Sequence, residues 1–571
     1  MEVKKAVVIG AGVMGAGIAA QLANAGIEVE LLDIVPKPKE GQPPVEDRDV
    51  IAKSALARLA KDKPAALMHP KNARLIRPGN TEDHMDRLKD ADLIIEAVIE
   101  NPKIKSALFT KIDENRKPGA IVASNTSTIP LKDLVDGQSE EFKKDFMITH
   151  FFNPPRYMPL LELITSEDND PKTVADLTRF MDEKMGKGVI NCNDTPGFIA
   201  NRIGTFWLQA AINEAFDRGI DVEVADALIG KPMGIPKTGV FALVDMVGLD
   251  LMPHISASLL EKLPDEDGYC KIHREIELID KMIEDGYTGR KGKGGFYRLN
   301  TEGGKKVKEV IDLTTGEYHE AKRPKPKASA KGIKKGLKAM LEDKSKEGRY
   351  SWAVLKQTLV YAAEHAEEVA GNITAVDDAM KMGYNWKKGP FELVDQLGAD
   401  WFVKKLGAEG EAVPALLKTA AEKGGFYRVD NGKLQHLGID GTYRNIERPE
   451  GVLLLSDVKR ASKPVLQNKS AKVWDIGDSV LCLEFTSPNN SIDEHILDMM
   501  NKTIDLIEDK NNRYKGLVIH NDVDNFSVGA NLKRAVIAVK TFRYGAVEKM
   551  VKQGQDTFKR PKYANHPVVG E

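Results

Sequence analysis

The sequence predicts an α/β domain with a doubly wound, mostly parallel sheet, then two copies of an all-helical domain, then an incomplete second α/β domain. Three observations carry this prediction. Short apolar runs alternate with helical patterns up to about residue 188, a helical pattern in the middle of the chain occurs twice, and a new alternation of strands and a helix begins near residue 471. Strands that alternate with helices favour a parallel sheet that is covered on both faces.

Composition and charge exclude several classes of protein. The chain of 571 residues is 42% hydrophobic and 29% charged, which is an ordinary globular balance. Its 83 lysines and arginines nearly cancel its 85 aspartates and glutamates, which argues against a nucleic-acid partner. The three cysteines, Cys192, Cys270 and Cys482, lack CxxC spacing, so we expect reduced thiols and no metal site. The first strand begins near Lys5 and no apolar run is long enough to span a membrane; we expect a cytoplasmic protein without a signal peptide.

A glycine-rich turn joins the first predicted strand to a helix. The apolar run Ala6–Ile9 is followed by the turn Gly10–Gly15 and by a helical segment, Ile18–Ala25. Glycine is needed here because the turn is tight and the backbone must approach a pyrophosphate at the helix N-terminus. The pattern therefore predicts a dinucleotide site in a Rossmann-type turn, formed by Gly10, Gly12, Val13, Met14 and Gly15.

An acidic residue ends the second predicted strand, Val29–Asp33. At this distance from the turn, Asp33 would accept hydrogen bonds from the ribose hydroxyls of a dinucleotide and repel a 2′-phosphate. The sequence therefore favours NAD over NADP, although Lys37 close by leaves the alternative open. The segment Pro36–Pro44 that follows is rich in proline and charge, and we expect a solvated loop without chemistry.

Further strands and a helix complete the predicted sheet. A helix from about Val50 carries Ser54 and Lys61 on one face, and Ala91–Val98 and Ala120–Ser124 have the pattern of buried parallel strands. Ligands bind at the carboxyl ends of such strands. Six polar residues fall there: Glu100, Lys105, Asn125, Ser127, His150 and Asn153. A surface ion pair for the first two, and turn or capping roles for Asn125 and Ser127, are the alternatives.

One histidine and one carboxylate lie at the ends of two apolar strands that a proline-rich bend joins, between Thr149 and Glu162. In this arrangement His150 and Glu162 can meet. Hydride leaves a carbinol carbon only as a base takes the hydroxyl proton, and imidazole is suited to that task near neutral pH. The carboxylate would fix the tautomer of the imidazole. The alternative is a core histidine beside an unrelated glutamate.

Several of these segments together resemble the (S)-3-hydroxyacyl-CoA dehydrogenases. They are Gly10–Gly15, Ile95–Asn101, Ala123–Ser127, His150–Pro154 and Asp194–Arg202, in the order and spacing of that family, and the resemblance covers roughly residues 1 to 300. It implies that His150 is the general base and Glu162 its orienting partner. It also implies that Ser127 and Asn201 hold the 3-oxygen and the thioester region of an acyl-CoA substrate.

The same resemblance implies further contacts with the cofactor NAD and with the substrate. Glu100, Lys105, Asn153 and Lys291 match positions that contact NAD in the family, and Ser54 and Lys61 match positions that reach coenzyme A. A lysine there would neutralise a phosphate. For Ser54 and Lys61, a plain solvated helix face is the alternative, because the proline-rich segment just upstream can shift the helix register.

An internal repeat occupies the middle of the chain. Ala225–Asp250 recurs as Asp377–Asp400, and Gly294–Arg298 recurs as Gly424–Arg428. The helical domain of the family pairs between subunits, so the resemblance implies a covalent pseudo-dimer in which the second copy packs on the first. We expect no second active site, because the second copy has no nucleotide-binding domain of its own.

A third pattern begins beyond a polar stretch. Val473–Phe485 is predicted as a strand, Ile492–Glu508 as an amphipathic helix and Gly516–His520 as a strand, followed by Asn525–Leu532. This resembles the opening of an enoyl-CoA hydratase (crotonase) domain, in which the backbone amide of Ala530 would be one of two oxyanion donors. The second donor and both catalytic glutamates of that family have no match here, so we assign no hydration chemistry.

These patterns predict six segments: the NAD-binding domain (1–188), the first helical copy (189–300), a Lys-rich linker (301–348), the second helical copy (349–430), a second linker (431–470) and the partial crotonase-like domain (471–571). We interpret the chain as the amino-terminal part of a bifunctional protein or as a truncation. We expect it to form homo-oligomers, or to associate in another way that completes the partial domain.

The sequence therefore predicts an NAD-dependent 3-hydroxyacyl-CoA dehydrogenase that acts in fatty-acid β-oxidation or in a short-chain hydroxybutyryl-CoA pathway. Two other hypotheses are another Rossmann β-hydroxyacid dehydrogenase, which would use a catalytic lysine, and a non-catalytic acyl-CoA or NAD-binding scaffold. The set of His150, Glu162, Ser127 and Asn201 argues against both.

Overall fold

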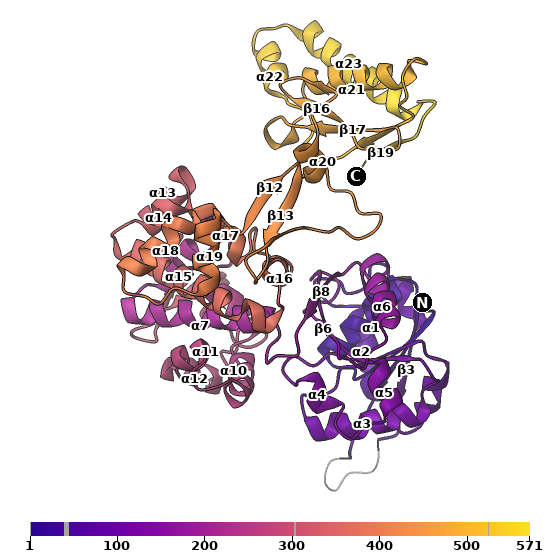
Figure 1. Ribbon diagram of the computed structural model, residues 1–571, viewed down its shortest axis with the longest axis vertical. Helices are drawn as coiled ribbons and strands as arrows, with labels where there is room; N and C mark the ends of the chain where they lie inside the picture. Colours follow the sequence, from indigo (N-terminus) through magenta and orange to yellow (C-terminus); the bar gives the residue numbers. More distant parts are fainter. Residues whose placement is uncertain (1, 39–44, 302–303, 524, 571) are drawn as a thin grey trace. The chain divides into compact units, whose positions relative to one another are not determined.

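The computed structural model describes residues 2–38, 45–301, 304–523 and 525–570. The chain forms two compact units (Figure 1). The first consists of Met1–Phe426 with Leu437–Thr442, and the second of Tyr427–His436 with Tyr443–Glu571. Of the proline-rich segment Pro36–Pro44, residues 39–44 lie outside the described part of the chain.

An eight-stranded sheet forms the start of the first unit, in the order β3-β2-β1-β4-β5-β6-β7-β8. The strands β1 to β6 run parallel, whereas β7 pairs antiparallel with β6 and parallel with β8, so the predicted mostly parallel sheet is confirmed. The strands are β1 (Lys5–Ile9), β2 (Glu28–Asp33), β3 (Ile76–Asn80), β4 (Leu93–Glu96), β5 (Ile121–Ser124), β6 (Phe146–Phe151), β7 (Leu160–Ile164) and β8 (Gly188–Cys192).

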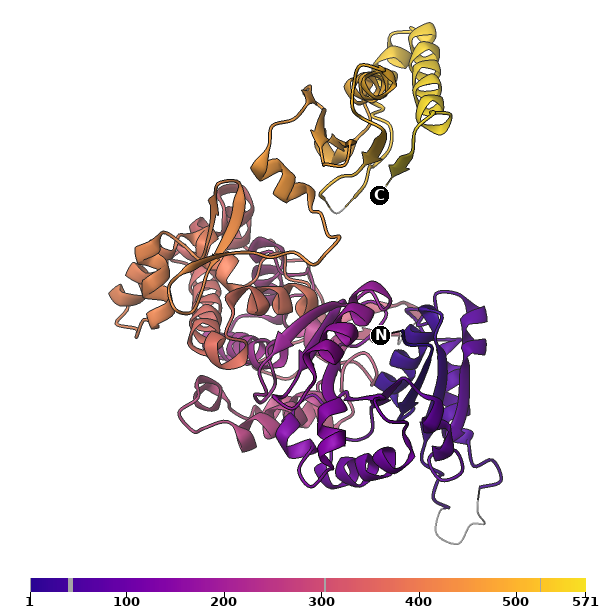
Figure 2. The same cartoon turned by 45° about the vertical axis from the view of Figure 1, so that its right-hand side comes forward.

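Helices cover both faces of this sheet (Figure 2). On one face, apolar residues of α1 (Val13–Asn24), α2 (Val50–Leu59) and α6 (Pro171–Glu183) join the strands in one core. On the other face, the rings of Phe109 from α3 (Pro102–Asn115), Phe142 from α5 (Glu140–Asp145) and Phe146 from β6 lie with centroids 5.0 to 5.6 Å apart. Shorter elements are α4 (Leu131–Leu134) and the 3-10 helices η1 (Pro70–Leu75) and η2 (Met85–Asp90).

Two helical copies complete most of the first unit. The first copy comprises α7 (Ala200–Arg218), α8 (Val222–Ile229), η3 (Lys231–Met233), α9 (Phe241–Val247), α10 (Leu251–Lys262), α11 (Gly268–Ile272) and α12 (Glu277–Glu284). The second comprises α15 (Lys346–Val369), α16 (Ile373–Tyr384), α17 (Pro390–Leu397), α18 (Ala399–Ala408) and α19 (Ala415–Lys423). The long helices α7 and α15 pack together, where the rings of Phe206 and Tyr361 stack with centroids 3.9 Å apart. The second copy thus packs on the first.

The aspartate that recurs in the repeated motif, Asp226 in the first copy and Asp377 in the second, makes the same kind of hydrogen bond in both copies. In the first copy, the Asp226 carboxylate accepts hydrogen bonds from the amides of Val240 and Phe241, both at 2.8 Å, at the start of α9. In the second copy, the Asp377 carboxylate accepts one from the amide of Phe391 at 2.8 Å, at the start of α17. An aspartate in one helix therefore satisfies the free amides of a later helix in both copies, which explains why the motif recurs.

The segment 301–348, predicted as a Lys-rich linker with a short helical stretch near Leu337, contains more regular structure in its described part than that single stretch. It contributes to a sheet of β9 (Tyr297–Asn300), β10 (Val307–Ile311) and β11 (Tyr318–Glu320), and it forms α13 (Lys327–Lys335) and α14 (Leu337–Leu341). Leu337, Met340 and Leu341 are buried. Their spacing places three apolar side chains on one face, which suffices to fold a segment whose overall composition is polar.

The second unit contains a five-stranded sheet in the order β15-β16-β17-β18-β19. Helix α21 (Glu494–Glu508) packs on it through Ile496, Met500 and Ile504. Its elements are β15 (Leu466–Gln467), β16 (Ala471–Asp475), β17 (Val480–Phe485), η5 (Pro488–Asn490), β18 (Gly516–Ile519), α22 (Lys533–Lys540), α23 (Tyr544–Lys562) and β19 (Val568–Gly570). The predicted single strand Val473–Phe485 is in fact a hairpin of β16 and β17, because three consecutive residues, Gly477 to Ser479, adopt positive φ and reverse the chain.

The segment 431–470, also predicted as a linker, contains regular elements as well. Part of it belongs to a three-stranded sheet of β12 (Tyr427–Asp430), β13 (Lys433–Leu437) and β14 (Tyr443–Asn445), and α20 (Leu455–Ala461) follows. Within the described ranges, no single helix is long and apolar enough to cross a membrane, although the bent pair α9 and α10 reaches that length and composition together.

Candidate active site

The glycine turn between β1 and α1 is shaped for a close approach by a ligand. Gly10 has a φ of +107°, and a Cβ atom there would lie 2.5 Å from the carbonyl oxygen of Ala97. A Cβ on Gly15 would lie 1.8 Å from the carbonyl oxygen of Gly10, so neither position tolerates a side chain. A Cβ on Gly12, at the N-terminus of α1, would meet no atom within 4 Å. Open space in front of free helix amides fits the diphosphate of a dinucleotide.

Asp33 ends β2 beside this turn. Its carboxylate accepts hydrogen bonds from the amide of Ala11 at 2.5 Å and from its own neighbour Ile34 at 2.7 Å, which ties the end of β2 to the glycine turn. The adjacent strand end, Asn80 of β3, pairs with Asp33 in the sheet register. The position at the carboxyl edge of the sheet is the one that the sequence predicts for a residue that contacts ribose hydroxyls.

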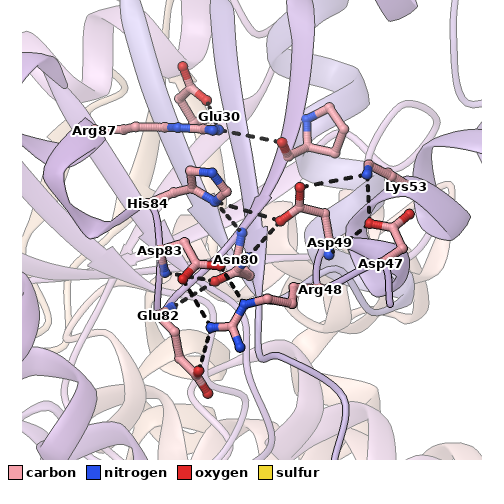
Figure 3. A network of polar contacts seen from close by, with 11 residues as sticks. Glu30, Asp47, Arg48, Asp49, Lys53, Asn80, Glu82, Asp83, His84 and Arg87 are labelled. Atoms are coloured by element: carbon pink, nitrogen blue, oxygen red, sulfur yellow. Dashed lines mark hydrogen bonds and ion pairs between the residues drawn. The ribbon is translucent and has the colours of Figure 1, made fainter. Parts of the chain in front are cut away.

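A polar network surrounds Asn80 at this corner (Figure 3). The Arg48 guanidinium contacts the carboxylates of Glu82 and Asp83, both at 2.7 Å, and Asn80 donates to Asp83 at 2.9 Å. The hydrogen bonds from Arg48 and Asn80 lower the pKa of Asp83 to about 2. Arg48 is therefore already paired with two carboxylates, which leaves an acidic corner that suits uncharged ribose hydroxyls better than a phosphate.

A buried lysine of α3 contacts two carboxylates, one at the end of β4 and one in the loop between β4 and α3. The Lys105 ammonium is 2.7 Å from Glu96 and 3.3 Å from Glu100, and the Lys105 side chain is only 1% exposed. Burial would raise the pKa of Glu100, but the charge of Lys105 and hydrogen bonds from Thr126 and Ser127 outweigh it and lower the pKa. Glu100 is thus held ionised at the edge of the sheet, whereas Lys105 is too deep to contact a ligand except through Glu100.

The loop after β5 is held against the same edge. The amide of Ser127 donates to Glu100 at 2.8 Å, and Asn125 accepts from the amide of Phe151 at 2.9 Å, which joins this loop to the end of β6. Neither the Ser127 hydroxyl nor the Asn201 amide group has a recorded hydrogen bond within the described residues. Both are half-buried. Their polar groups therefore remain available to a ligand.

His150 and Glu162 meet across the β6–β7 hairpin. They are direct partners in the antiparallel register, and Nδ1 of His150 lies 2.7 Å from Oε2 of Glu162. His150 is 4% exposed and Glu162 is fully buried. Because a carboxylate only accepts, Nδ1 carries the hydrogen and Nε2 is left with a free lone pair. Within the described residues, Nε2 of His150 has no recorded hydrogen bond.

The second oxygen of Glu162 is held by the N-terminus of α7. Oε1 accepts hydrogen bonds from the amides of Ile199 at 3.1 Å and Ala200 at 2.8 Å. Two backbone donors stabilise the ionised carboxylate in a place that excludes water. Asn201 follows Ala200 directly, so the same contact that fixes Glu162 also brings Asn201 to the neighbourhood of the pair.

Sequence reasoning missed the aromatic side chains around His150. The ring of Phe152 lies 4.6 Å from the His150 ring, centroid to centroid, and that of Phe198 lies 5.6 Å away. Phe198 has a φ of +50°, which a residue other than glycine rarely adopts. The unusual backbone of Phe198 belongs to the turn just before α7. The segment Asp194–Arg202 carried a signal for this turn, but it did not show which ring would face the histidine.

Lys187 is a second residue that the sequence did not single out. Its buried ammonium donates to the carbonyl oxygens of Pro155 and, at 2.9 Å, Met158, both in the bend that joins β6 to β7. Burial lowers the pKa of Lys187 to about 8, so the ammonium remains mostly protonated at pH 7. The proline-rich bend has few backbone donors of its own, and Lys187 satisfies two of its carbonyls.

The remaining predicted residues lie at exposed positions. Asn153 lies on the bend after β6, and Lys291 lies on a loop where its ammonium is 3.5 Å from the carbonyl oxygen of Val247. Ser54 is exposed on α2. The expectation that Lys61 shares a helix face with Ser54 is wrong, because α2 ends at Leu59 and Lys61 lies in the following turn.

Ala530 lies in the second unit in a strand-like bridge with Ile492. The neighbours of Ala530 make the hydrogen bonds of this bridge: Ile492 donates to Gly529 at 2.9 Å, and Asn531 donates to Ile492 at 2.8 Å. Among the described residues, the amide of Ala530 itself has no recorded acceptor, and the residue is exposed. The amide is therefore available as a hydrogen-bond donor.

Family models match most of the first unit. The model described as "3-hydroxyacyl-CoA dehydrogenase, NAD binding domain" matches residues 5–195. The model described as "3-hydroxyacyl-CoA dehydrogenase, C-terminal domain" matches residues 197–299 and again 348–445. The repeated match agrees with the two helical copies in the fold.

Curated relatives match the full length of the chain. A probable 3-hydroxyacyl-CoA dehydrogenase from Bacillus subtilis strain 168 is 39% identical over all of this chain and 73% of its own length. A putative fatty acid oxidation complex trifunctional enzyme from Rickettsia felis is 35% identical over all of this chain and 74% of its own length. Among solved structures, 3-hydroxybutyryl-CoA dehydrogenase from Escherichia coli K12 covers 74% of this chain and 99% of its own, with a TM-score of 0.55 and 21% identity, which is a likeness of fold.

Proposed function

Because the chain belongs to the 3-hydroxyacyl-CoA dehydrogenase family, we propose that it oxidises the C3 hydroxyl of an (S)-3-hydroxyacyl-CoA thioester at a single site built around His150 and Glu162. The chain is an NAD-dependent oxidoreductase. The observation that supports the site most directly is the 2.7 Å contact between His150 and a Glu162 carboxylate whose other oxygen is held by two amides.

Proton transfer falls to His150. In the oxidative direction its neutral Nε2 takes the proton of the C3 hydroxyl, and in the reverse direction the imidazolium returns that proton to the ketone oxygen. When bound, NAD accepts the hydride that leaves C3. Glu162 keeps Nδ1 protonated and lowers the cost of the positive charge that forms on the ring, as an orienting carboxylate does in other His-dependent enzymes.

Other residues of the chain bind and orient. The open backbone at Gly12 and the carboxylate of Asp33 would hold the diphosphate and the ribose of NAD, and Glu100 presents an ionised group at the same sheet edge. We assign Ser127 and Asn201 to the 3-oxygen and the thioester region of the substrate. Polar side chains without partners, beside a buried base, are suited to orient a reacting group.

The substrate and coenzyme are tested together by following NADH absorbance. We expect rapid oxidation of NADH with acetoacetyl-CoA and little with free acetoacetate, because the free acid lacks the coenzyme A moiety whose binding orients the ketone. NADPH should be poorer than NADH by roughly 100-fold in kcat/KM, since its 2′-phosphate would face Asp33 and the carboxylates near Asn80. Equal rates with free acetoacetate, or with NADPH, would contradict the assignment. Asp33→Asn should reduce the difference in kcat/KM between NADH and NADPH.

We propose that residues 471–570 have a crotonase-like fold and serve in fatty-acid oxidation. Two observations support this second role: the free amide of Ala530, and the name of the Rickettsia felis relative, a putative fatty acid oxidation complex trifunctional enzyme. A free amide beside a glycine can donate to a thioester oxygen. Hydration itself would need carboxylates that we do not assign here.

Hydrogen exchange tests the role of Ala530. In the wild-type chain, exchange of the backbone amides of residues 526–532 should slow when acetoacetyl-CoA is added, because the Ala530 amide would then donate to the thioester oxygen. Free acetoacetate at the same concentration serves as the control and should leave these amides unchanged. Unchanged exchange with the thioester at saturating concentration would refute an oxyanion role for Ala530.

A further inference from the structure

The end of helix α16 packs against strand β7, which carries Glu162, and against helix α7, whose N-terminal amides hold Glu162. This helix belongs to the second helical copy, yet it packs on α7 and also on strands β7 and β8 of the sheet. Its last three residues, Met382–Tyr384, lie against β8, β7 and α7, and we call them the α16 wedge. Asn385, with a φ of +55°, ends the helix there.

On one side the α16 wedge fits into a notch on α7. A Cβ atom on Gly204 would lie 2.1 Å from both Cζ and the hydroxyl oxygen of Tyr384, so the absence of a side chain at Gly204 is what admits the ring. Ala200 and Gly204 are one helical turn apart and share a face of α7. The Tyr384 ring therefore rests one turn beyond the amide of Ala200, which donates to Glu162.

On its other side the α16 wedge lies on the sheet. A Cβ on Gly383 would lie 2.8 Å from Cδ2 of Leu160 in β7, 3.5 Å from Cβ of Ala200 in α7 and 3.7 Å from Cε1 of Phe152. Met382 lies against Gly188 of β8, the register partner of Leu160. Phe152 is the residue whose ring lies 4.6 Å from that of His150. Gly383 thus faces β7, α7 and the ring beside the catalytic histidine at once, with no room for a side chain against Leu160.

The charge of Glu162 acts on Tyr384 in the α16 wedge. Burial raises the pKa of Tyr384, and the Glu162 carboxylate raises it further. The Trp207 ring lies edge to face with the Tyr384 ring, with centroids 6.0 Å apart, and with the Trp386 ring, with centroids 5.2 Å apart. A second tie between the copies lies next to Asn201: the fully buried Arg202 pairs with Asp267 of its own copy and with Glu368 of α15.

We propose that the α16 wedge is a positioning element through which the second helical copy sets the distance between the N-terminus of α7 and strand β7, and thereby orients Glu162 and His150. The second copy has no nucleotide-binding sheet, and this contact gives it a part in the chemistry of the first. The pair depends on the relative position of two elements, because Glu162 comes from β7 and its two amide donors come from α7. An element packed on both fixes that position.

The test moves the Tyr384 ring without touching the catalytic pair. Gly204→Ala places a methyl group where the ring lies, so we expect kcat with acetoacetyl-CoA and NADH to fall roughly tenfold while Kd for NADH changes less than about twofold, since small displacements cost turnover rather than coenzyme binding. Gly204→Ala with Tyr384→Leu removes the clashing atoms, and kcat should recover at least about threefold. Tyr384→Phe keeps the ring and should stay within about twofold of wild type in kcat.

Gly407→Ala is the matched control. It makes the same change on a helix of the second copy, α18, where a new Cβ meets no atom within 4 Å, and it should leave kcat unchanged. The proposal is overturned if Gly204→Ala keeps kcat within about twofold of wild type, or if the double variant shows no recovery. If Gly204→Ala does not fold, Tyr384→Leu and Tyr384→Phe decide: a loss of kcat in the first alone supports the proposal, and equal kcat overturns it.

This inference rests on the roles proposed for His150 and Glu162, and the two fail in different ways. If the proposed function is wrong, replacing His150 itself will leave turnover normal. If only the present inference is wrong, replacing His150 will still lower turnover, and Gly204→Ala will leave turnover normal.

Discussion

Replacing His150 with glutamine will lower kcat by about 10²- to 10⁴-fold while leaving the affinity for NADH unchanged within a factor of about two. Glutamine has a similar reach and keeps a donor toward Glu162, but it cannot take up and return a proton at the position of Nε2. His150 is only 4% exposed, so water is poorly placed to substitute as the base. Stopped-flow measurement of NADH oxidation with acetoacetyl-CoA, together with a fluorescence titration of NADH, separates the two effects.

A matched control for this substitution lies on β11. His319 is exposed, and its ring nitrogen Nδ1 is 3.2 Å from the carbonyl oxygen of Glu320, far along the chain from the catalytic strands. His319→Gln should therefore turn over at the wild-type rate. Turnover in His150→Gln within about tenfold of wild type would remove His150 from the role of general base.

Replacing Glu162 with glutamine should lower kcat by about two orders of magnitude or more and also weaken the fold. Glu162 accepts from His150 at one oxygen and from the amides of Ile199 and Ala200 at the other. A glutamine has one accepting oxygen and one donating nitrogen, so one set of donors must face another donor. Either the histidine takes the wrong tautomer or the N-terminus of α7 loses its acceptor.

The stability effect of Glu162→Gln has a measurable size. A buried donor without a partner costs about 1 to 3 kcal/mol, which should appear as a lower midpoint of thermal unfolding of the full chain. Glu183→Gln, at the exposed end of α6, makes the same chemical change on the surface and should alter neither kcat nor the midpoint. If Glu162→Gln retains full activity, His150 needs no orienting carboxylate and the proposed pair is wrong.

Local patterns predicted most strands of the first sheet, because each depends on residues adjacent in sequence, whereas β3 and β8 were not predicted. The first strand begins at Lys5 and helix α2 begins at Val50, the residues near which the sequence predicted each start. The contact between His150 and Glu162 was also within reach, since a hairpin whose register is set by a short bend brings its two ends together.

Composition over longer stretches predicted less. The described part of 301–348 contains strands and a helix, α13, beyond the short helical stretch near Leu337 that the sequence predicted, because a few apolar residues at helical spacing outweigh a polar average. The strand Val473–Phe485 is a hairpin, because the residues of its turn adopt positive φ, which a pattern of apolar residues does not register. Lys61 does not lie on α2 as predicted, because the helix ends two residues earlier, at Leu59.

The amino-acid order alone predicts the glycine turn, the acid at the end of β2 and the hairpin pair from residues that are close in sequence, and it shows the repeat directly. The tertiary packing supplies what no local pattern encodes: the amides of Ile199 and Ala200 on Glu162, the ammonium of Lys187 on the bend, and the α16 wedge against α7 and β7. These contacts join residues far apart in the chain, and their energy depends on which surfaces meet, so they become visible only when the packed molecule is in view.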